Sequence, residues 1–180
     1  MSQDSFNIFA ANLNDNGGQA LKLESAEAAA QKITELVKGE AAVKKIIVHI
    51  SSCLNDLLKK DIVNKIGMQD SDKILISENL TADCDISITG YDYIIAGSGA
   101  VALNSMEHDL KETLVPPVNI LIKKAPEIFD NLNDIFNAHG GDFQKISNLT
   151  IISGPSKTAD IEKKIVHGMH GPKKLFVMIY

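Results

Sequence analysis

Apolar, strand-like runs alternate along this chain with segments of helical periodicity, and this alternation constrains the possible folds most. Residues 46–50 read Ile-Ile-Val-His-Ile, a nearly continuous apolar run that is typical of a parallel strand covered on both faces. A segment with apolar residues on one helical face follows and ends at Gly67. Strands that alternate with helices of this length form βαβ units. The sequence therefore predicts an α/β fold with three layers and a mainly parallel sheet.

The same patterns place the other elements. Ser25 is expected to cap a helix that reaches Lys38, and two short strands joined by a tight turn are expected between residues 86 and 103. Further strands are expected at residues 74–76, 118–122, 149–152 and 175–180, and further helices at about 54–67, 126–139 and 159–166.

The domain organisation follows from length and composition. A chain of 180 residues is long enough for one domain with a substantial core. Its first 24 residues are mixed polar and contain the turn-rich sequence Asn-Asp-Asn-Gly-Gly at residues 14–18. We therefore expect a polar N-terminal arm over residues 1–24 and a single domain over residues 25–180.

The charge pattern limits the classes of ligand and partner. The formal net charge is −5, and all 18 basic residues are lysines. A nucleic-acid-binding protein usually presents a basic face with arginines, so no nucleic-acid partner is expected. An anionic ligand would have to be held by lysines, backbone N–H groups or hydroxyls. The polar N-terminus and the lack of a long apolar run predict no signal peptide, no membrane span and a cytoplasmic protein.

The two cysteines limit the cofactors. Cys53 and Cys84 are 31 positions apart and form no C-x-x-C pair, so this chain alone is not expected to ligate an iron–sulfur cluster or a structural zinc ion. Reduced thiols are expected for both. No cofactor is therefore predicted to be bound by this chain alone.

The segment from Leu149 to Pro172 is the most informative for a ligand. It reads as a strand, a Gly-Pro-Ser-Lys-Thr loop and a helix. Backbone N–H groups at a helix N-terminus attract anions, and Lys157 adds a cation. The spacing does not fit an ATP-binding P-loop. An ordinary βα turn capped by Ser156 or Thr158 explains the sequence about equally well.

Three polar residues near this loop qualify the prediction. Asp160 would partly cancel the positive field, pair with Lys157, or orient a hydroxyl-bearing ligand. His167 and His170 have helical spacing only if the helix continues past Gly168, and no carboxylate or thiolate completes a metal site. No metal site is predicted, and one histidine is expected to line a cleft or form a hydrogen bond.

Two features in the middle of the chain have simple structural explanations. The sequence Gly97-Ser98-Gly99 mimics part of a dinucleotide-binding motif, but the residues after it are too short and strand-like for the required helix. A hairpin turn explains its glycines better. Asp92 lies between two tyrosines without a nearby partner in sequence, so a surface or capping position is expected for it rather than a general base.

Two stretches resemble a known family. ISITGYDYIIAGSGAVAL at residues 86–103 and SGPSKTADIEKKIVHGMHGPKKLFVMIY at residues 153–180 are similar to the LUD domain of the lactate-utilization protein C family. The resemblance covers residues 86–180 and implies the fold of the sugar-phosphate isomerase and coenzyme A transferase superfamily (NagB/RpiA/CoA transferase-like). The family pattern A-E-T-G-T is replaced by Ala-Gly-Ser-Gly-Ala at residues 96–100, so the glutamate is missing.

The resemblance also implies a function and a site. It implies an accessory subunit of bacterial L-lactate oxidation to pyruvate that acts with iron–sulfur partner proteins. The alternative is a small-molecule enzyme or binding domain for a phosphate-, carboxylate- or coenzyme A-containing ligand, and a purely structural adaptor is a third possibility. The site is expected over the carboxyl ends of the strands, and no catalytic residue is assigned. The expected ligand-binding residues are Gly97, Ser98, Gly99, Gly154, Pro155, Ser156, Lys157, Thr158, Asp160, His167, His170 and Gly171.

Overall fold

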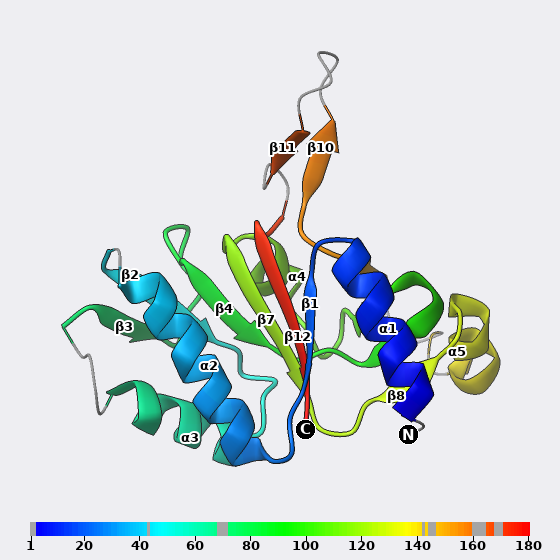
Figure 1. The fold of residues 1–180 in the computed structure, drawn as a ribbon, viewed down its shortest axis with the longest axis horizontal. Coiled ribbons are helices and arrows are strands. Elements are labelled where there is room, and N and C mark those ends of the chain that lie inside the picture. The colour runs from blue at the N-terminus through cyan, green and yellow to red at the C-terminus, as the bar shows by residue number, and fades with distance from the viewer. Residues whose placement is uncertain are drawn as a thin grey trace.

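A parallel six-stranded sheet forms the centre of the computed structural model (Figure 1). The structure describes residues 3–42, 44–67, 72–141, 143, 147–159, 165–167 and 171–180. Every pair of neighbouring strands in the central sheet is parallel. The strands, in spatial order, are β1 (Gln19–Lys22), β12 (Lys174–Ile179), β7 (Val118–Lys123), β4 (Ile86–Thr89), β2 (Ile46–Ile50) and β3 (Ile74–Ser77). The predicted α/β class with a mainly parallel sheet is confirmed.

Two helices, α2 (Ala26–Ala41) and α3 (Asp56–Gly67), cover one face of this sheet. Ser25 caps α2 as predicted, because its hydroxyl accepts a hydrogen bond from the backbone N–H of Ala28. The helices bury alternate strand residues such as Val48 and Ile120, which are fully buried. The opposite face is covered as well, and burial on both faces explains the continuous apolar runs in the strands.

The opposite face carries α1 (Gln3–Asp15) and a second sheet. The second sheet has the order β8 (Glu127–Phe129), β5 (Tyr93–Ile95), β6 (Ala100–Asn104) and β9 (Leu149–Ile152). Helix α5 (Leu132–His139) packs on this smaller sheet through Ile135. The short helix α4 (Leu110–Leu114) contacts β4. None of the helices in the described part of the chain is both long and apolar enough to cross a membrane.

The N-terminal segment differs from the expectation of a turn-rich arm. Residues 3–15 form α1 and residues 19–22 form an edge strand of the central sheet. Phe6, Phe9 and Leu13 lie on one face of α1 and are buried against the sheet. The segment folds as a helix because these three apolar residues, separated by polar ones, supply enough burial to fix it.

Two helices expected from the sequence also differ. Residues 127–129 form strand β8, and α5 begins only after Asn131, which caps it in a reciprocal arrangement with Asp134. In place of the helix at 159–166, strands β10 (Lys157–Ala159) and β11 (Ile165–His167) pair antiparallel. The helix N-terminus on which the predicted anion site depended is therefore not formed at residues 157–159.

The turn at Gly97–Gly99 is the predicted hairpin. Residues 96–98 form a single 3-10 turn, and β5 and β6 on either side pair antiparallel. Gly99 has a φ of 60°, in the left-handed region that favours glycine. A Cβ atom at Gly99 would lie 2.3 Å from the backbone nitrogen of Leu13, so glycine is also required by the close approach of α1.

Candidate functional site

The loops that follow the central strands enclose a cavity of about 230 Å³ at the carboxyl ends of β4, β7 and β12. In parallel α/β sheets this is the end at which ligands bind. Most of the lining comes from loop residues and from residues at or just beyond the ends of strands, because the parallel order brings these segments to one edge. Its lining includes Cys53, Gly90, His108, Lys123, Lys124 and Tyr180.

Cys53 lies in the loop between β2 and α3, and two donors point at its sulfur atom. The hydroxyl of Ser51 donates to Sγ at 3.1 Å, and the backbone N–H of Gly90 donates to Sγ at 3.3 Å. The backbone N–H of Cys53 in turn donates to the Ser51 hydroxyl at 3.3 Å. Since donors stabilise a negatively charged sulfur, this arrangement favours the thiolate.

His108 and Asp92 form a buried pair beside this thiol. Nε2 of His108 lies 3.3 Å from a carboxylate oxygen of Asp92, and the two side chains are 8% and 7% exposed. The other carboxylate oxygen of Asp92 accepts a 2.6 Å hydrogen bond from the backbone N–H of Asn104. Asp92 therefore fixes the orientation of the imidazole ring, which leaves Nδ1 as the ring nitrogen available for other contacts.

Gly90 allows the thiol and the imidazole to converge. A Cβ atom at Gly90 would lie 3.1 Å from the Cε1 atom of His108 and 3.3 Å from Sγ of Cys53. The buried Nδ1 atom of His108 has no hydrogen bond of standard geometry within the described residues. The imidazole thus contacts Asp92 through one nitrogen and presents the other near the sulfur.

The electrostatics of the three groups support one another. Burial raises the pKa of Cys53, but the neighbouring His108 and the hydrogen bonds from Ser51 and the Gly90 N–H outweigh it and hold the pKa below its usual value. Burial also raises the pKa of Asp92, and the contacts with His108 and Asn104 more than reverse this. Burial lowers the pKa of His108, yet Asp92 and Cys53 together raise it to about 9. The three shifts therefore each favour the charged form of the group: a thiolate, an imidazolium and a carboxylate.

Helix α4 anchors the loop that carries His108. The side-chain amide of Asn119 on β7 donates to the hydroxyl of Ser87 at 2.6 Å and to the backbone carbonyl of Glu112 at 3.3 Å. Nε2 of His49 lies 3.0 Å from the carboxylate of Glu112. These buried polar contacts fix α4 on the sheet, and with it the preceding residues 105–109.

One group of side chains near the cavity could be considered for a metal ion. Asp92, Glu107 and His108 present ligand atoms within 4.8 Å of one another. Asp92 and His108, however, are already paired with each other, and Asp92 also accepts the N–H of Asn104. Glu107 is exposed. We therefore interpret the group as a hydrogen-bonded network and do not assign it to a metal.

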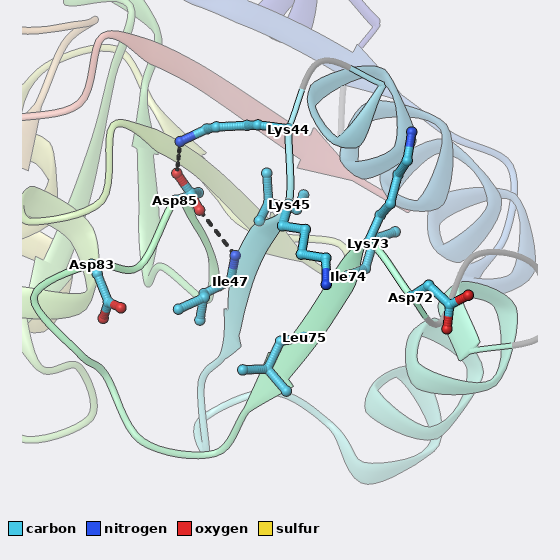
Figure 2. Close-up of a pocket in the computed structure, with 10 residues that line it drawn as sticks. Lys44, Lys45, Ile47, Asp72, Lys73, Ile74, Leu75, Asp83 and Asp85 are labelled. Carbon is cyan, nitrogen blue, oxygen red and sulfur yellow. Dashed lines mark hydrogen bonds and ion pairs between the residues drawn. The ribbon is translucent and has the colours of Figure 1, made fainter.

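A larger hollow of about 520 Å³ lies at the opposite end of the sheet, at the amino ends of β2 and β3 (Figure 2). It is lined by lysines and aspartates in equal number, together with apolar residues. Lys44 and the backbone N–H of Ile47 both bind the carboxylate of Asp85, which gives this residue a structural role (Figure 2). Because its described lining contains no thiol, side-chain hydroxyl or imidazole, we place the chemistry at the carboxyl ends instead.

The turn at residues 97–99 and the loop that contains Gly154 were both predicted to bind a ligand. The structure brings them together at the C-terminal end of α1. The side-chain amide of Asn12 donates to the carbonyls of Ala96 and Gly97 at 2.8 and 3.2 Å. The carbonyl of Ser98 accepts hydrogen bonds from the side chains of Asn16 and Ser153 at 3.0 and 2.9 Å. The turn at residues 97–99 thus uses its polar groups in structural contacts.

The loop at residues 154–157 is also engaged with α1. Nζ of Lys157 donates to the backbone carbonyl of Asn16 at 2.9 Å, beyond the C-terminal end of α1. Gly154 has a φ of 126°, and a Cβ there would lie 2.7 Å from the same carbonyl oxygen. Pro155 lines this contact, since its Cδ would lie 3.8 Å from a Cβ at Gly17.

Residues 156 and 171 place this region relative to the central sheet. The backbone N–H of Ser156 donates to the carbonyl of Pro172 at 2.8 Å, and Gly171 lies against Ser156. Both therefore lie near the amino end of β12, opposite the expected position over the carboxyl ends of the central strands. Thr158 and His167 lie in β10 and β11, and Asp160 and His170 lie outside the described residues. Ligand binding by the predicted set stays a prediction.

Sequence reasoning missed the residues at the carboxyl ends. Asp92 was expected at the surface or in a cap, but it is buried and its partner is 16 positions away. Cys53 was considered only as a cofactor ligand. The signal that could have found Cys53 is position, since it follows the predicted strand at residues 46–50 by three residues, where parallel strands place their functional side chains. Asp92 follows β4 by three residues, but the end of β4 was not predicted within residues 86–103.

The fold and the cavity together define an α/β protein with a site at the carboxyl ends of parallel strands. The chain belongs to the LUD domain family, whose family model matches residues 6–180. A structure of a DUF162 family protein from Deinococcus radiodurans has the same fold, with a TM-score of 0.65, 15% identity, and coverage of 99% of this chain and 98% of that one.

Curated relatives match part of the chain. An uncharacterized protein of Neisseria meningitidis serogroup B is 34% identical over 101 residues, which cover 52% of this chain and 41% of that protein. Lactate utilization protein C of Halalkalibacterium halodurans is 35% identical over 96 residues, and that of Oceanobacillus iheyensis is 31% identical over 93 residues. Both matches cover 49% of this chain and 40% of the relative, so the matched segments span less than half of these proteins.

Proposed function

We propose that this protein is an accessory subunit of bacterial L-lactate utilization, in the oxidation of L-lactate to pyruvate in the cytoplasm. The observation that carries the proposal is the similarity to proteins named lactate utilization protein C, at 28–35% identity, within a chain of the LUD domain family. Membership of the family over residues 6–180 means that nearly the whole chain belongs to the relevant domain.

An accessory role, with iron–sulfur partner proteins, is supported by the thiol inventory of the chain. Its 180 residues contain two cysteines, whereas an iron–sulfur cluster is usually held by four thiolates. Cys84 is buried beside β4, and Cys53 lies in the cavity at the carboxyl ends of the strands. Electron transfer through such a cluster would therefore need thiolates from outside these 180 residues, which we propose a partner protein supplies.

Genetics and copurification test this proposal separately. Deletion of the gene in the native cell should abolish growth on L-lactate and leave growth on pyruvate intact, and the wild-type gene should restore it. A tagged chain should then recover iron–sulfur proteins from cells grown on L-lactate. Unimpaired growth of the deletion strain on L-lactate would refute the role in lactate utilization. Recovery of the tagged chain without any iron–sulfur protein would refute only the proposed partners.

A specific observation favours the alternative of a binding domain or enzyme for a small anion. Lys123 and Lys124 line the carboxyl-end cavity, near the pair of His108 and Asp92. Thermal unfolding with L-lactate, pyruvate, coenzyme A or sugar phosphates tests it. A ligand at about 100 times its dissociation constant should stabilise by about 2.7 kcal/mol. Loss of the shift in Lys123→Ala would locate the ligand in this cavity, and loss in Lys157→Ala would locate it at the loop first predicted.

A further inference from the structure

We propose that Cys53 is the nucleophile of an acyl-transfer site, with His108 as its acid–base partner and Asp92 as the positioning residue. The three side chains come from the loops after β2, β4 and β6 and meet over Gly90. A thiol beside an imidazole that is itself held by a carboxylate is an arrangement by which proteins activate a nucleophile. This inference goes beyond the proposed role in lactate utilization and does not depend on it.

The sulfur atom is both activated and accessible. Ser51 and the Gly90 N–H donate hydrogen bonds to Sγ, which stabilise negative charge on it. Cys53 is nevertheless an exposed residue that lines the mouth of the cavity. A buried structural cysteine would lack this access, as Cys84 does.

The imidazole of His108 faces the site, and one of its nitrogens has no structural hydrogen bond within the described residues. His108 is 8% exposed, its Nε2 is held by Asp92, and its Nδ1 is buried without a hydrogen bond of standard geometry within the described residues. An unpartnered buried nitrogen costs stability unless a function or a ligand uses it. Transfer of a proton to a leaving group is such a use.

The cavity indicates the class of substrate. Its volume of about 230 Å³ is smaller than the 300–1,000 Å³ typical of sites for drug-sized ligands, so it suits a short acyl group. Lys123 and Lys124 give it positive charge, while Leu58, Ile122 and Tyr180 form an apolar side. The site therefore fits an ester or thioester of a short acid that carries a second negative charge.

The chemistry balances within these groups. Sγ of Cys53 forms a bond to the acyl carbon, the bond from that carbon to the leaving oxygen or sulfur breaks, and His108 donates its proton to the leaving group. Water then attacks the acyl carbon and gives a proton to the neutral imidazole. The carbon–sulfur bond breaks, which releases the carboxylic acid and restores the thiolate and the imidazolium.

The purified chain and two probe esters test the proposal. With 4-nitrophenyl acetate, the wild type should release a stoichiometric burst of 4-nitrophenolate and carry an acetyl group on Cys53, as shown by peptide mass spectrometry. His108→Gln should lower the acylation rate about 100-fold or more, the usual contribution of a general acid or base. Lys123→Ala should slow acylation by 4-nitrophenyl hydrogen succinate more than acylation by the acetate.

Cys84 provides the matched control. Cys84→Ala should leave the burst unchanged, and Cys53→Ala should abolish it. Asp92→Asn should retain the burst at a reduced rate, and the midpoint of its acylation rate against pH should move to higher pH. A purely structural role of Asp92 would not move this midpoint. If His108→Gln does not fold, the order of acetylation in the wild-type protein tests the proposal, because the proposal requires acetylation of Cys53 before Cys84. Equal labelling of the two thiols, or equal rates in folded His108→Gln and wild type, would overturn the proposal.

Discussion

The Nε2 atom of His108 lies 3.3 Å from the carboxylate of Asp92, and the same imidazole is held close to the thiol of Cys53. Asp92 precedes β5 and His108 follows β6, so both lie at the open end of the β5–β6 hairpin. Cys53 comes from a different βα loop, after β2 on the central sheet. The site therefore depends on the sheet topology, so variants that test the fold also test the site.

The stability of the protein should depend on pH through His108. Asp92 and Cys53 raise the pKa of His108 to about 9, above the 6.5 expected when unfolded. A raised pKa stabilises the fold fully below pH 6.5, and this contribution is lost as the pH rises through about 9. In urea unfolding, the free-energy difference between wild type and His108→Gln should shrink by up to about 3 kcal/mol from pH 6.5 to 9.5.

The surrounding charges do not reverse this prediction. Asp92 has a lowered pKa and stays ionised throughout the range, and Glu107, Lys123, Lys124 and Tyr180 also line the cavity. Cys53 has a lowered pKa, so its contribution increases with pH and opposes that of His108. Repeating the measurement in a Cys53→Ala background separates the two. A constant difference across the range there would contradict the assignment.

Helix α1 should be part of the core. Phe9 is fully buried, and replacing a buried phenylalanine with alanine costs about 3–5 kcal/mol, so Phe9→Ala should destabilise the protein by that amount. Ile8 on the same helix is 51% exposed, and Ile8→Ala should change stability by about 0.5 kcal/mol or less. Similar values for both variants in chemical denaturation would show that residues 3–15 do not pack as described.

The hairpin turn should not accept a side chain at Gly99. The left-handed conformation costs alanine about 1–2 kcal/mol, and the contact with the backbone of Leu13 adds to this. Gly99→Ala should therefore destabilise by more than 2 kcal/mol in total, by order of magnitude. Gly39 is a helical glycine of α2 with open space around it, so Gly39→Ala should stabilise by about 0.5–1 kcal/mol. A stable Gly99→Ala protein would contradict the close approach of α1.

The strands were predictable because their signal is local. The run at residues 46–50 and the segments that became β7 and β12 are apolar and short, as strands buried in a core must be. The N-cap at Ser25 was predictable for the same reason, since a cap is decided by a few neighbouring residues.

The elements that were mispredicted depend on distant contacts. The segment Lys157–Ala159 has neighbours with good helical propensity, yet it pairs with Ile165–His167, and Lys157 binds the carbonyl of Asn16. Tertiary contacts of this kind override local propensity. Helix α1 was missed because its apolar residues gain their stability only against the sheet.

The candidate site was unpredictable for a related reason. Cys53 follows β2 of the central sheet and His108 follows β6 of the second sheet, so the two residues meet only because the two sheets pack together. Gly90 has no recognisable motif, although its missing side chain makes room for both groups. Strand order follows from the packing of the whole domain, so spacing along the chain does not reveal these neighbours.

The pH dependence of Cys53 alkylation in the wild-type protein tests the central claim most directly. The rate of reaction with iodoacetamide should be followed at Cys53 by peptide mass spectrometry from pH 5 to 10, with the buried Cys84, whose pKa burial raises, as internal control. The account predicts a midpoint below the value of about 8.5 for a free thiol, which moves upward in His108→Gln. A midpoint at or above 8.5 in the wild type, unchanged by His108→Gln, would contradict it.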